Sequence, residues 1–177
     1  MDAVTDAGDY GEKSLRSVNF PDRYVRHRNL LAYVEVIDSK LAASDATFRI
    51  RDPLAPGAGE GCYSFEATNP KLRGWYLRHQ NFRLKLSKAT NDEVFKKDAT
   101  FCLKQALASR ASYEESHQAS FESFNFPGYF IRHSDFELAI RQNDGSDVFK
   151  RDATFVVERP VRAPGSFGDD NNAVPAR

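Results

Sequence analysis

Apolar and polar residues alternate along much of the chain. In residues 82–86 the apolar Phe82, Leu84 and Leu86 are separated by single basic residues, and residues 136–140 show a similar alternation. A period of two is typical of β-strands that have one buried face and one solvated face. We therefore predict a protein built of strands.

A unit of about 50 residues occurs three times in the sequence. Each copy has an Arg-His pair, followed 18 or 19 residues after the histidine by Asp-Ala-Thr-Phe. The histidines are 52 and 54 residues apart. A fixed period indicates one unit built three times, so a binding site should recur at three equivalent positions. The copies are Arg26-His27 with 45–48, Arg78-His79 with 98–101, and Arg132-His133 with 152–155.

The Asp-Ala-Thr-Phe segments continue the alternation, and we interpret them as strands. In the second copy this places Ala99, Phe101 and Leu103 on the core face and Thr100 on the opposite face. With the Arg-His strand, its hairpin partner and a short opening strand, each repeat has four strands. Twelve strands in three equivalent units predict an all-β fold, a β-trefoil with pseudo-threefold symmetry. The opening strands lie around Ser14, Ser64 and Ser120, and the predicted core aromatics are Phe48, Phe101 and Phe155.

Turn residues mark the boundaries of the predicted domain. Residues 143–146, Asn-Asp-Gly-Ser, indicate a hairpin turn, and residues 106–118 are long enough to hold a short helical turn. Beyond residue 160 the chain is rich in Pro, Gly, Asp and Asn. We predict a flexible arm (1–13), one domain (14–160) with repeats at about 14–54, 62–107 and 119–160, and a disordered tail (161–177).

Charge argues against some classes of partner. The chain has 25 basic and 25 acidic residues, so it lacks the basic footprint of proteins that bind nucleic acid or anionic membranes. No apolar run approaches the roughly 18 residues of a membrane span, and residues 1–13 do not resemble a signal peptide. We expect a monomer, cytoplasmic if the chain is native as it stands and extracellular if it is a module of a longer protein.

Two cysteines, Cys62 and Cys102, are too few for a disulfide framework. Since Cys102 falls on the predicted strand face opposite the apolar residues, we interpret both as free thiols. The sequence has no Cys/His spacing typical of metal sites and no Gly-rich phosphate loop. We therefore expect no metal and no cofactor.

Three segments of the third repeat carry a resemblance to a known family. Residues 120–133, 143–146 and 149–155 resemble the arabinose-binding domain of α-L-arabinofuranosidases, carbohydrate-binding module family 42, and all three repeats match from Ser14 to about Pro160. The resemblance implies a β-trefoil with up to three pockets for terminal arabinofuranose side chains of hemicelluloses such as arabinoxylan or arabinan. Each pocket would be built around one histidine and one aspartate: His133 with Asp152, His79 with Asp98, and His27 with Asp45.

These residue types suit a neutral sugar. A carboxylate accepts hydrogen bonds from two neighbouring hydroxyls, and a neutral imidazole donates or accepts one. An aromatic ring can cover the C–H face of the furanose. The aromatic candidates are Tyr24, Trp75, Tyr76, Tyr129 and Phe130, and Asn125 is a further polar candidate.

A structural role for the same residues stays open. Each histidine shares a strand face with an apolar residue two positions earlier, Val25, Leu77 or Ile131, which indicates partial burial. A buried His-Asp pair would also recur three times after duplication. For the three arginines of the Arg-His pairs we expect a structural or surface role, because a neutral sugar needs no guanidinium.

The repeats are unequal. The third keeps every element, whereas the first has Ala42 where the others have Phe95 and Phe149, so its pocket should be the weakest. A glycosidase needs two carboxylates about 5 to 9.5 Å apart, but threefold symmetry keeps the three aspartates apart. We expect a non-catalytic binding module, and the alternative is an intracellular trefoil for protein or cytoskeletal contacts with vestigial pockets.

Overall fold

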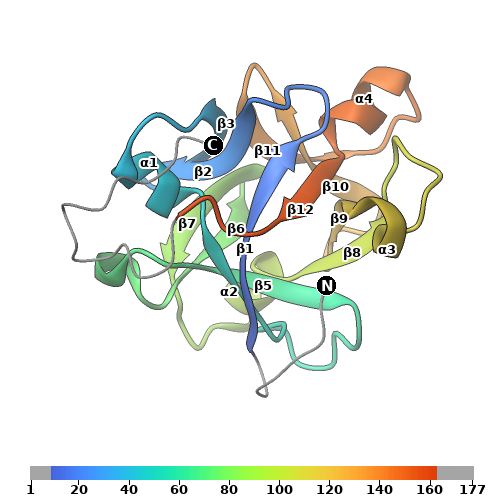
Figure 1. The fold of residues 1–177 in the computed structure, drawn as a ribbon. Coiled ribbons are helices and arrows are strands. Elements are labelled where there is room, and N and C mark those ends of the chain that lie inside the picture. The colour runs from blue at the N-terminus through green and yellow to red at the C-terminus, as the bar shows by residue number, and fades with distance from the viewer. Residues whose placement is uncertain (1–8, 163–177) are drawn as a thin grey trace.

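The computed structural model describes residues 9–162, and the predictions made for residues 1–8 and 163–177 lie outside this range. The described chain forms twelve strands with short helices between some of them (Figure 1). The elements are β1 Asp9–Ser17, β2 Arg23–Arg28, β3 Leu31–Val36, α1 Lys40–Asp45, β4 Phe48–Arg51, β5 Cys62–Ala67, the 3₁₀ helix η1 Pro70–Leu72, β6 Trp75–Gln80, β7 Arg83–Lys88, α2 Glu93–Asp98, β8 Phe101–Gln105, α3 Tyr113–Ser116, β9 Gln118–Ser123, β10 Tyr129–Ser134, β11 Glu137–Gln142, α4 Asp147–Asp152 and β12 Phe155–Glu158.

The strand pairing confirms the predicted β-trefoil. The first and fourth strands of the repeats close a six-stranded barrel, in which β1 pairs with β4, β4 with β5, β5 with β8, β8 with β9, β9 with β12, and β12 with β1. The second and third strands of each repeat form the hairpins β2–β3, β6–β7 and β10–β11. Contacts among β3, β7 and β11 join the hairpins into a cap over one end of the barrel.

The hairpin turns hold bulky residues in the left-handed region. Leu30, Phe82 and Phe136 have φ values of 66°, 67° and 65°, a conformation that is unfavourable for side chains of this kind. The carbonyl oxygens of these residues accept hydrogen bonds from the backbone of another hairpin, at 2.8 to 2.9 Å. The turn geometry thus links each repeat to its neighbour.

The barrel is filled by aromatic side chains at equivalent positions. Phe48, Phe101 and Phe155 are fully buried, as predicted, and Phe65 and Phe121 lie beside them. The Phe65 ring packs edge-on against Phe121, with centroids 5.4 Å apart. This buried cluster provides the rigid frame from which the second and third strands of each repeat project.

The Asp-Ala-Thr-Phe segments are not wholly strands, so this part of the prediction was wrong. The aspartate is the last residue of a six-residue helix, the alanine is its C-cap, and the strand begins at the phenylalanine. Thr100 is buried, not solvated, and its hydroxyl donates to the Lys96 carbonyl oxygen at 2.8 Å. The Ala/Phe spacing of two fits a strand, but it also fits a helix end followed by a strand. In Figure 1, α1 and α4 lie on the outside of the barrel.

Residues 143–146 also differ from the prediction. They do not connect two strands but lead from β11 into α4, where the Ser146 side chain caps the helix by accepting from the Phe149 N–H at 3.1 Å. By contrast, the short helix α3 confirms the predicted helical turn between the second and third repeats.

The two cysteines form a disulfide, so the prediction of free thiols was wrong. Antiparallel pairing of β5 with β8 places Cys62 directly opposite Cys102. This register joins the first and last strands of one repeat, and the alternation within a single strand does not reveal it.

The domain extends beyond the predicted limits at both ends. β1 begins at Asp9, so residues 9–13 pair with β4 and do not belong to a flexible arm. At the other end the Val161 N–H donates to Ser14 Oγ at 3.0 Å, and Arg162 forms an ion pair with Glu12. Within residues 9–162 no helix is long and apolar enough to cross a membrane.

Candidate functional site

The histidine and aspartate predicted for each repeat do come together. Nε2 of the histidine lies 3.6, 3.5 and 3.7 Å from Oδ1 of the aspartate in the first, second and third repeats. The histidine comes from the second strand of the repeat and the aspartate from the end of the following helix. The pairs are His27 with Asp45, His79 with Asp98, and His133 with Asp152.

The arginine next to each histidine is the third member of the group, which we call the Arg-His-Asp cluster. Its Nη2 donates to Oδ2 of the aspartate at 2.7 Å from Arg26, 2.6 Å from Arg78 and 2.5 Å from Arg132. Its Nε donates to the carbonyl oxygen of the adjacent histidine. The arginines therefore have a structural role, as predicted. The sequence did not indicate that they act as partners of the aspartates.

The third cluster is completed by a residue from another repeat. Asn19, which follows β1 in the first repeat, donates from Nδ2 to Asp152 Oδ1 at 2.8 Å. Its Oδ1 lies 3.0 Å from His133 Nε2 and also accepts from the Ser17 hydroxyl. The asparagine thus bridges the histidine and the aspartate.

The second cluster is completed in the same way by Asn125, which follows β9 in the third repeat. Its Nδ2 donates to Asp98 Oδ1 at 2.8 Å, and its Oδ1 lies 2.9 Å from His79 Nε2. Our prediction placed Asn125 in a sugar pocket, and the structure places it in the hydrogen-bond network of the preceding repeat. The shared Ser-x-Asn pattern at 17–19 and 123–125 was the available signal for this role.

The first cluster lacks this bridge. The equivalent Asn69 uses its side-chain oxygen to accept from the Lys71 N–H and so caps η1, and Ala67 stands where the other repeats have serine. Nε2 of His27 has no hydrogen-bond partner. The prediction that this repeat departs most from the pattern is consistent with these contacts.

Burial without the bridge shifts two pKa values in opposite directions. Burial lowers the pKa of His27 from 6.5 to about 4, and it raises the pKa of Asp45 from 3.8 to about 6 despite the opposing effect of Arg26. As pH falls from 6.5 to 4, the unfolded chain gains a proton at histidine while the folded chain gains one at aspartate. The two contributions to the free energy of unfolding therefore oppose each other in this window.

All three clusters lie just beneath the surface. The histidines are 3 to 4% exposed, and the aspartate side chains are 7, 9 and 12% exposed in Asp45, Asp98 and Asp152. A carboxylate oxygen has two lone pairs, so one bond from arginine and one from asparagine leave capacity for further donors. Asp152 offers the most accessible carboxylate of the three.

The aromatic candidates divide into buried and accessible rings. Tyr24 is 2% exposed and donates its hydroxyl to Glu158, and Phe130 is 8% exposed, so neither presents a face to a ligand. Trp75 packs against the core, and burial raises the pKa of the half-buried Tyr76. Tyr129 is half-buried and lines a cavity.

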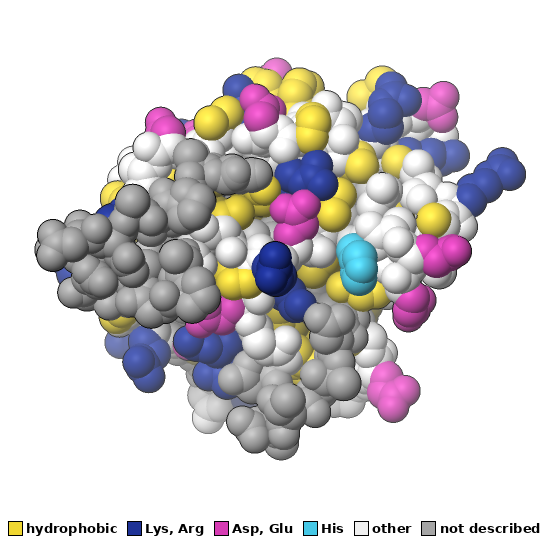
Figure 2. Space-filling view, viewed as in Figure 1, with side chains coloured by type: hydrophobic (Ala, Val, Ile, Leu, Met, Phe, Trp, Pro, Cys, Tyr) yellow, Lys and Arg dark blue, Asp and Glu magenta, His cyan; other side chains and the backbone are white. Residues whose placement is uncertain are grey.

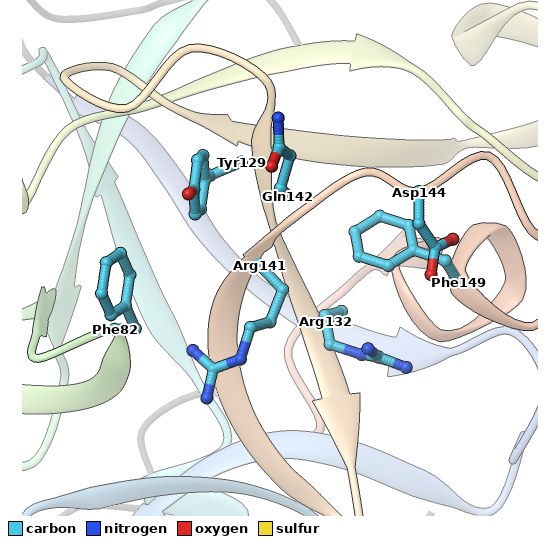
Figure 3. Close-up of a pocket in the computed structure, with 7 residues that line it drawn as sticks. All are labelled: Phe82, Tyr129, Arg132, Arg141, Gln142, Asp144 and Phe149. Atoms are coloured by element: carbon cyan, nitrogen blue, oxygen red, sulfur yellow. The ribbon is translucent and has the colours of Figure 1, made fainter.

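That cavity has a volume of about 450 Å³ and lies beside the third cluster. We call it the sugar pocket because the sequence prediction assigned a sugar to this repeat. The rings of Phe82 and Tyr129 stack at one end with centroids 5.7 Å apart, while Asp144 lies at the other end (Figure 3). The guanidinium of Arg132, which holds Asp152, forms part of the wall. The lining residues are Phe82, Tyr129, Arg132, Arg141, Gln142, Asp144 and Phe149.

No group of three or more His, Cys, Asp or Glu side chains suited to a metal ion occurs within residues 9–162. In the second and third clusters the aspartate carboxylate is instead held between a guanidinium and an amide. Such an arrangement presents fixed hydrogen-bond acceptors to a hydroxylated ligand.

A family model and several proteins match the chain. The model described as the alpha-L-arabinofuranosidase B domain matches residues 3–50, 13–118 and 110–168. An arabinofuranosidase/B-xylosidase of Trichoderma koningii is 32% identical over 148 residues, which cover 82% of this chain and 27% of the relative. Alpha-L-arabinofuranosidase B of Emericella nidulans is 28% identical over 152 residues, covering 84% of this chain and 28% of the relative. The chain thus spans little more than a quarter of these relatives.

Solved structures show the same fold. An arabinofuranosidase complexed with arabinofuranosyl-alpha-1,2-xylobiose superposes with a TM-score of 0.73 at 26% identity, covering 92% of this chain and 33% of that one. A BEL β-trefoil superposes with a TM-score of 0.59 at 12% identity, covering 88% and 96% of the two chains. The second comparison concerns the fold alone.

Proposed function

Because the chain belongs to the alpha-L-arabinofuranosidase B domain family, we propose that it is an arabinose-binding module that recognises terminal arabinofuranose side chains. The proposed ligands are hemicelluloses such as arabinoxylan or arabinan. The solved arabinofuranosidase with arabinofuranosyl-xylobiose is consistent with this class of ligand. The observation that carries the proposal is the threefold recurrence of an oriented carboxylate, together with the family match.

The proposed role of the aspartate follows from its partners. In the third cluster Arg132 holds Oδ2 of Asp152 and Asn19 holds Oδ1, so the orientation of the carboxylate is set before a ligand arrives. Two neighbouring sugar hydroxyls can then donate to the exposed edge without a large ordering cost. His133 would act mainly by positioning, since its Nε2 faces Asn19.

The sugar pocket adjoins the third cluster through Arg132 and offers further contacts, and neither Asp152 nor His133 is among its lining residues. Tyr129 and Phe82 offer apolar surface, while Gln142 and Asp144 offer polar groups. A binding site with a mostly apolar wall and a few fixed polar groups is typical for small ligands. We therefore propose the third repeat as the strongest site, the second as the next and the first as the weakest.

We propose that the module itself is non-catalytic. Glycoside hydrolysis needs a pair of carboxylates about 5 to 9.5 Å apart. In the second and third clusters the aspartate is instead paired with arginine, histidine and asparagine. A hydrolytic role would belong to a separate catalytic domain, as the length of the relatives allows.

Calorimetry tests the proposal with methyl α-L-arabinofuranoside and an arabinose-substituted xylo-oligosaccharide. One monosaccharide makes few contacts, so we expect a dissociation constant of roughly 0.1 to 10 mM for each site and tighter binding of branched polymers through several sites. Asp152→Asn should reduce binding strongly, and Asp45→Asn, the matched change in the first repeat, should reduce it least. A protein that binds neither probe, or binds methyl β-galactopyranoside equally well, contradicts the proposal.

A further inference from the structure

A second cavity lies next to α4 and is separate from the sugar pocket. Its volume is about 300 Å³. α4 contributes Phe149 to the sugar pocket and Asp147, Lys150 and Arg151 to the second cavity, whose other wall is the loop 107–110. The helix therefore stands between two hollows, and the exposed Val148 belongs to the same helix. We call the second hollow the basic cavity.

The charge of the basic cavity departs from that of the whole chain. Arg110, Lys150 and Arg151 line it together with one acid, Asp147, whereas the chain as a whole has no net charge. Within residues 9–162, none of the three cations forms an ion pair with Asp or Glu, although most arginines near the Arg-His-Asp clusters do. Figure 2 shows Lys and Arg side chains at the upper right, where Figure 1 places α4. The site is suited to an anion.

We propose that the basic cavity binds the carboxylate of a uronic acid carried by the same polysaccharide whose arabinofuranose occupies the sugar pocket. This inference rests on the proposed function. An α-helix with its side chains is about 10 to 12 Å across, so a ligand that reaches both hollows must be longer than one sugar. An acidic, arabinose-substituted polysaccharide meets that requirement. Val148, which is exposed on the same helix, adds apolar surface near the two hollows.

The basic cavity would therefore distinguish acidic from neutral polysaccharides that carry arabinose. The sugar pocket would accept the arabinofuranose of neutral and acidic chains alike, whereas the three cations would favour the acidic ones. Arg110 and Arg151 are exposed, so their attraction is partly screened by salt. Exposed ion pairs contribute modestly, and we expect a threefold to tenfold preference in affinity at low ionic strength.

Calorimetry at low salt on the intact chain tests the inference. The probes are an arabinose-substituted xylo-oligosaccharide and the same oligosaccharide carrying one glucuronic acid. The wild-type protein should bind the acidic probe about threefold to tenfold more tightly, and Lys150→Gln with Arg151→Gln should remove that preference while leaving the neutral probe unaffected. The preference should also fall as salt is added.

The second repeat provides a matched control. Lys96 and Lys97 occupy the same positions of α2, so Lys96→Gln with Lys97→Gln removes the same charge from a helix end that does not line the cavity. This control should keep the preference. The inference is overturned if wild type binds the two probes with equal affinity, or if both double variants lose the preference for the acidic probe equally. If wild type prefers a sulfated oligosaccharide as strongly as the glucuronic acid probe, the assignment to a carboxylate is overturned. If the neutral probe fails to bind wild type, the proposed function fails first.

Discussion

Removing the carboxylate of the second cluster should destabilise the protein strongly. In Asp98→Ala the guanidinium of Arg78, whose side chain is 11% exposed, loses the only acidic partner that it has within residues 9–162. Asn125 and His79 lose their neighbour at the same time. Breaking a buried ion pair from one side costs about 3 to 5 kcal/mol, because the other charge stays buried without compensation.

This cost is large enough to measure by heating. For a domain of about 150 residues, 1 kcal/mol corresponds to a change in Tm of about 2 to 4 °C, so Asp98→Ala should lower Tm by about 6 to 20 °C. Differential scanning calorimetry and urea unfolding followed by circular dichroism both report this change. The urea midpoint should fall while the slope of the transition stays unchanged.

A second variant separates the buried charge from simple loss of packing. Arg78→Met with Asp98→Leu removes both charges and fills most of the space, so it should be more stable than Asp98→Leu alone. The reasoning is refuted if Asp98→Ala changes Tm by less than about 2 °C. It is also refuted if the double variant is no more stable than the single one, because the cost would then not come from the unpaired guanidinium.

Three further outcomes follow from the structure. His27→Gln removes the histidine whose lowered pKa destabilises the fold in acid, so its free energy of unfolding relative to wild type should rise by about 2 kcal/mol as pH falls from 6 to 4; urea titrations at both pH values check this, and no rise contradicts the lowered pKa of His27. Asn19→Ala and Asn125→Ala should each lower stability by about 1 to 3 kcal/mol, whereas Asn69→Ala, which affects only the cap of η1, should cost less than either in the same unfolding assay. Cys62→Ser with Cys102→Ser should lower the free energy of unfolding by about 2 to 4 kcal/mol, and a variant as stable as wild type under non-reducing conditions would show that the disulfide contributes nothing.

The parts of the fold that could be predicted were those in which residues recur at a fixed spacing. The spacing of the Arg-His pairs indicated three units, and the alternation around Phe82 and Phe136 indicated strands, which together suffice for a β-trefoil. The helices before Asp45, Asp98 and Asp152 were missed because six residues are too few to show a period of 3.6. Their caps, Ser39, Asp92 and Ser146, were the available signals.

The candidate site was predictable only within one repeat. His133 and Asp152 could be paired because they recur at a fixed spacing, but their partner Asn19 lies more than 100 residues away and comes from a different repeat. The disulfide was missed for a related reason, since it depends on the register between β5 and β8. Local patterns carry no information about which strands become neighbours when the barrel closes.

The exchange of asparagines between repeats has a consequence for how such a molecule can arise. A chain with a single unit could not place its asparagine on its own histidine and aspartate. The complete cluster would form only between neighbouring chains in a ring of three. Ligand recognition and trimer formation would then have begun as one event. Within one chain each copy can differ from the others, and the first cluster, with Ala67 and the redirected Asn69, lacks the bridge that the other two clusters have.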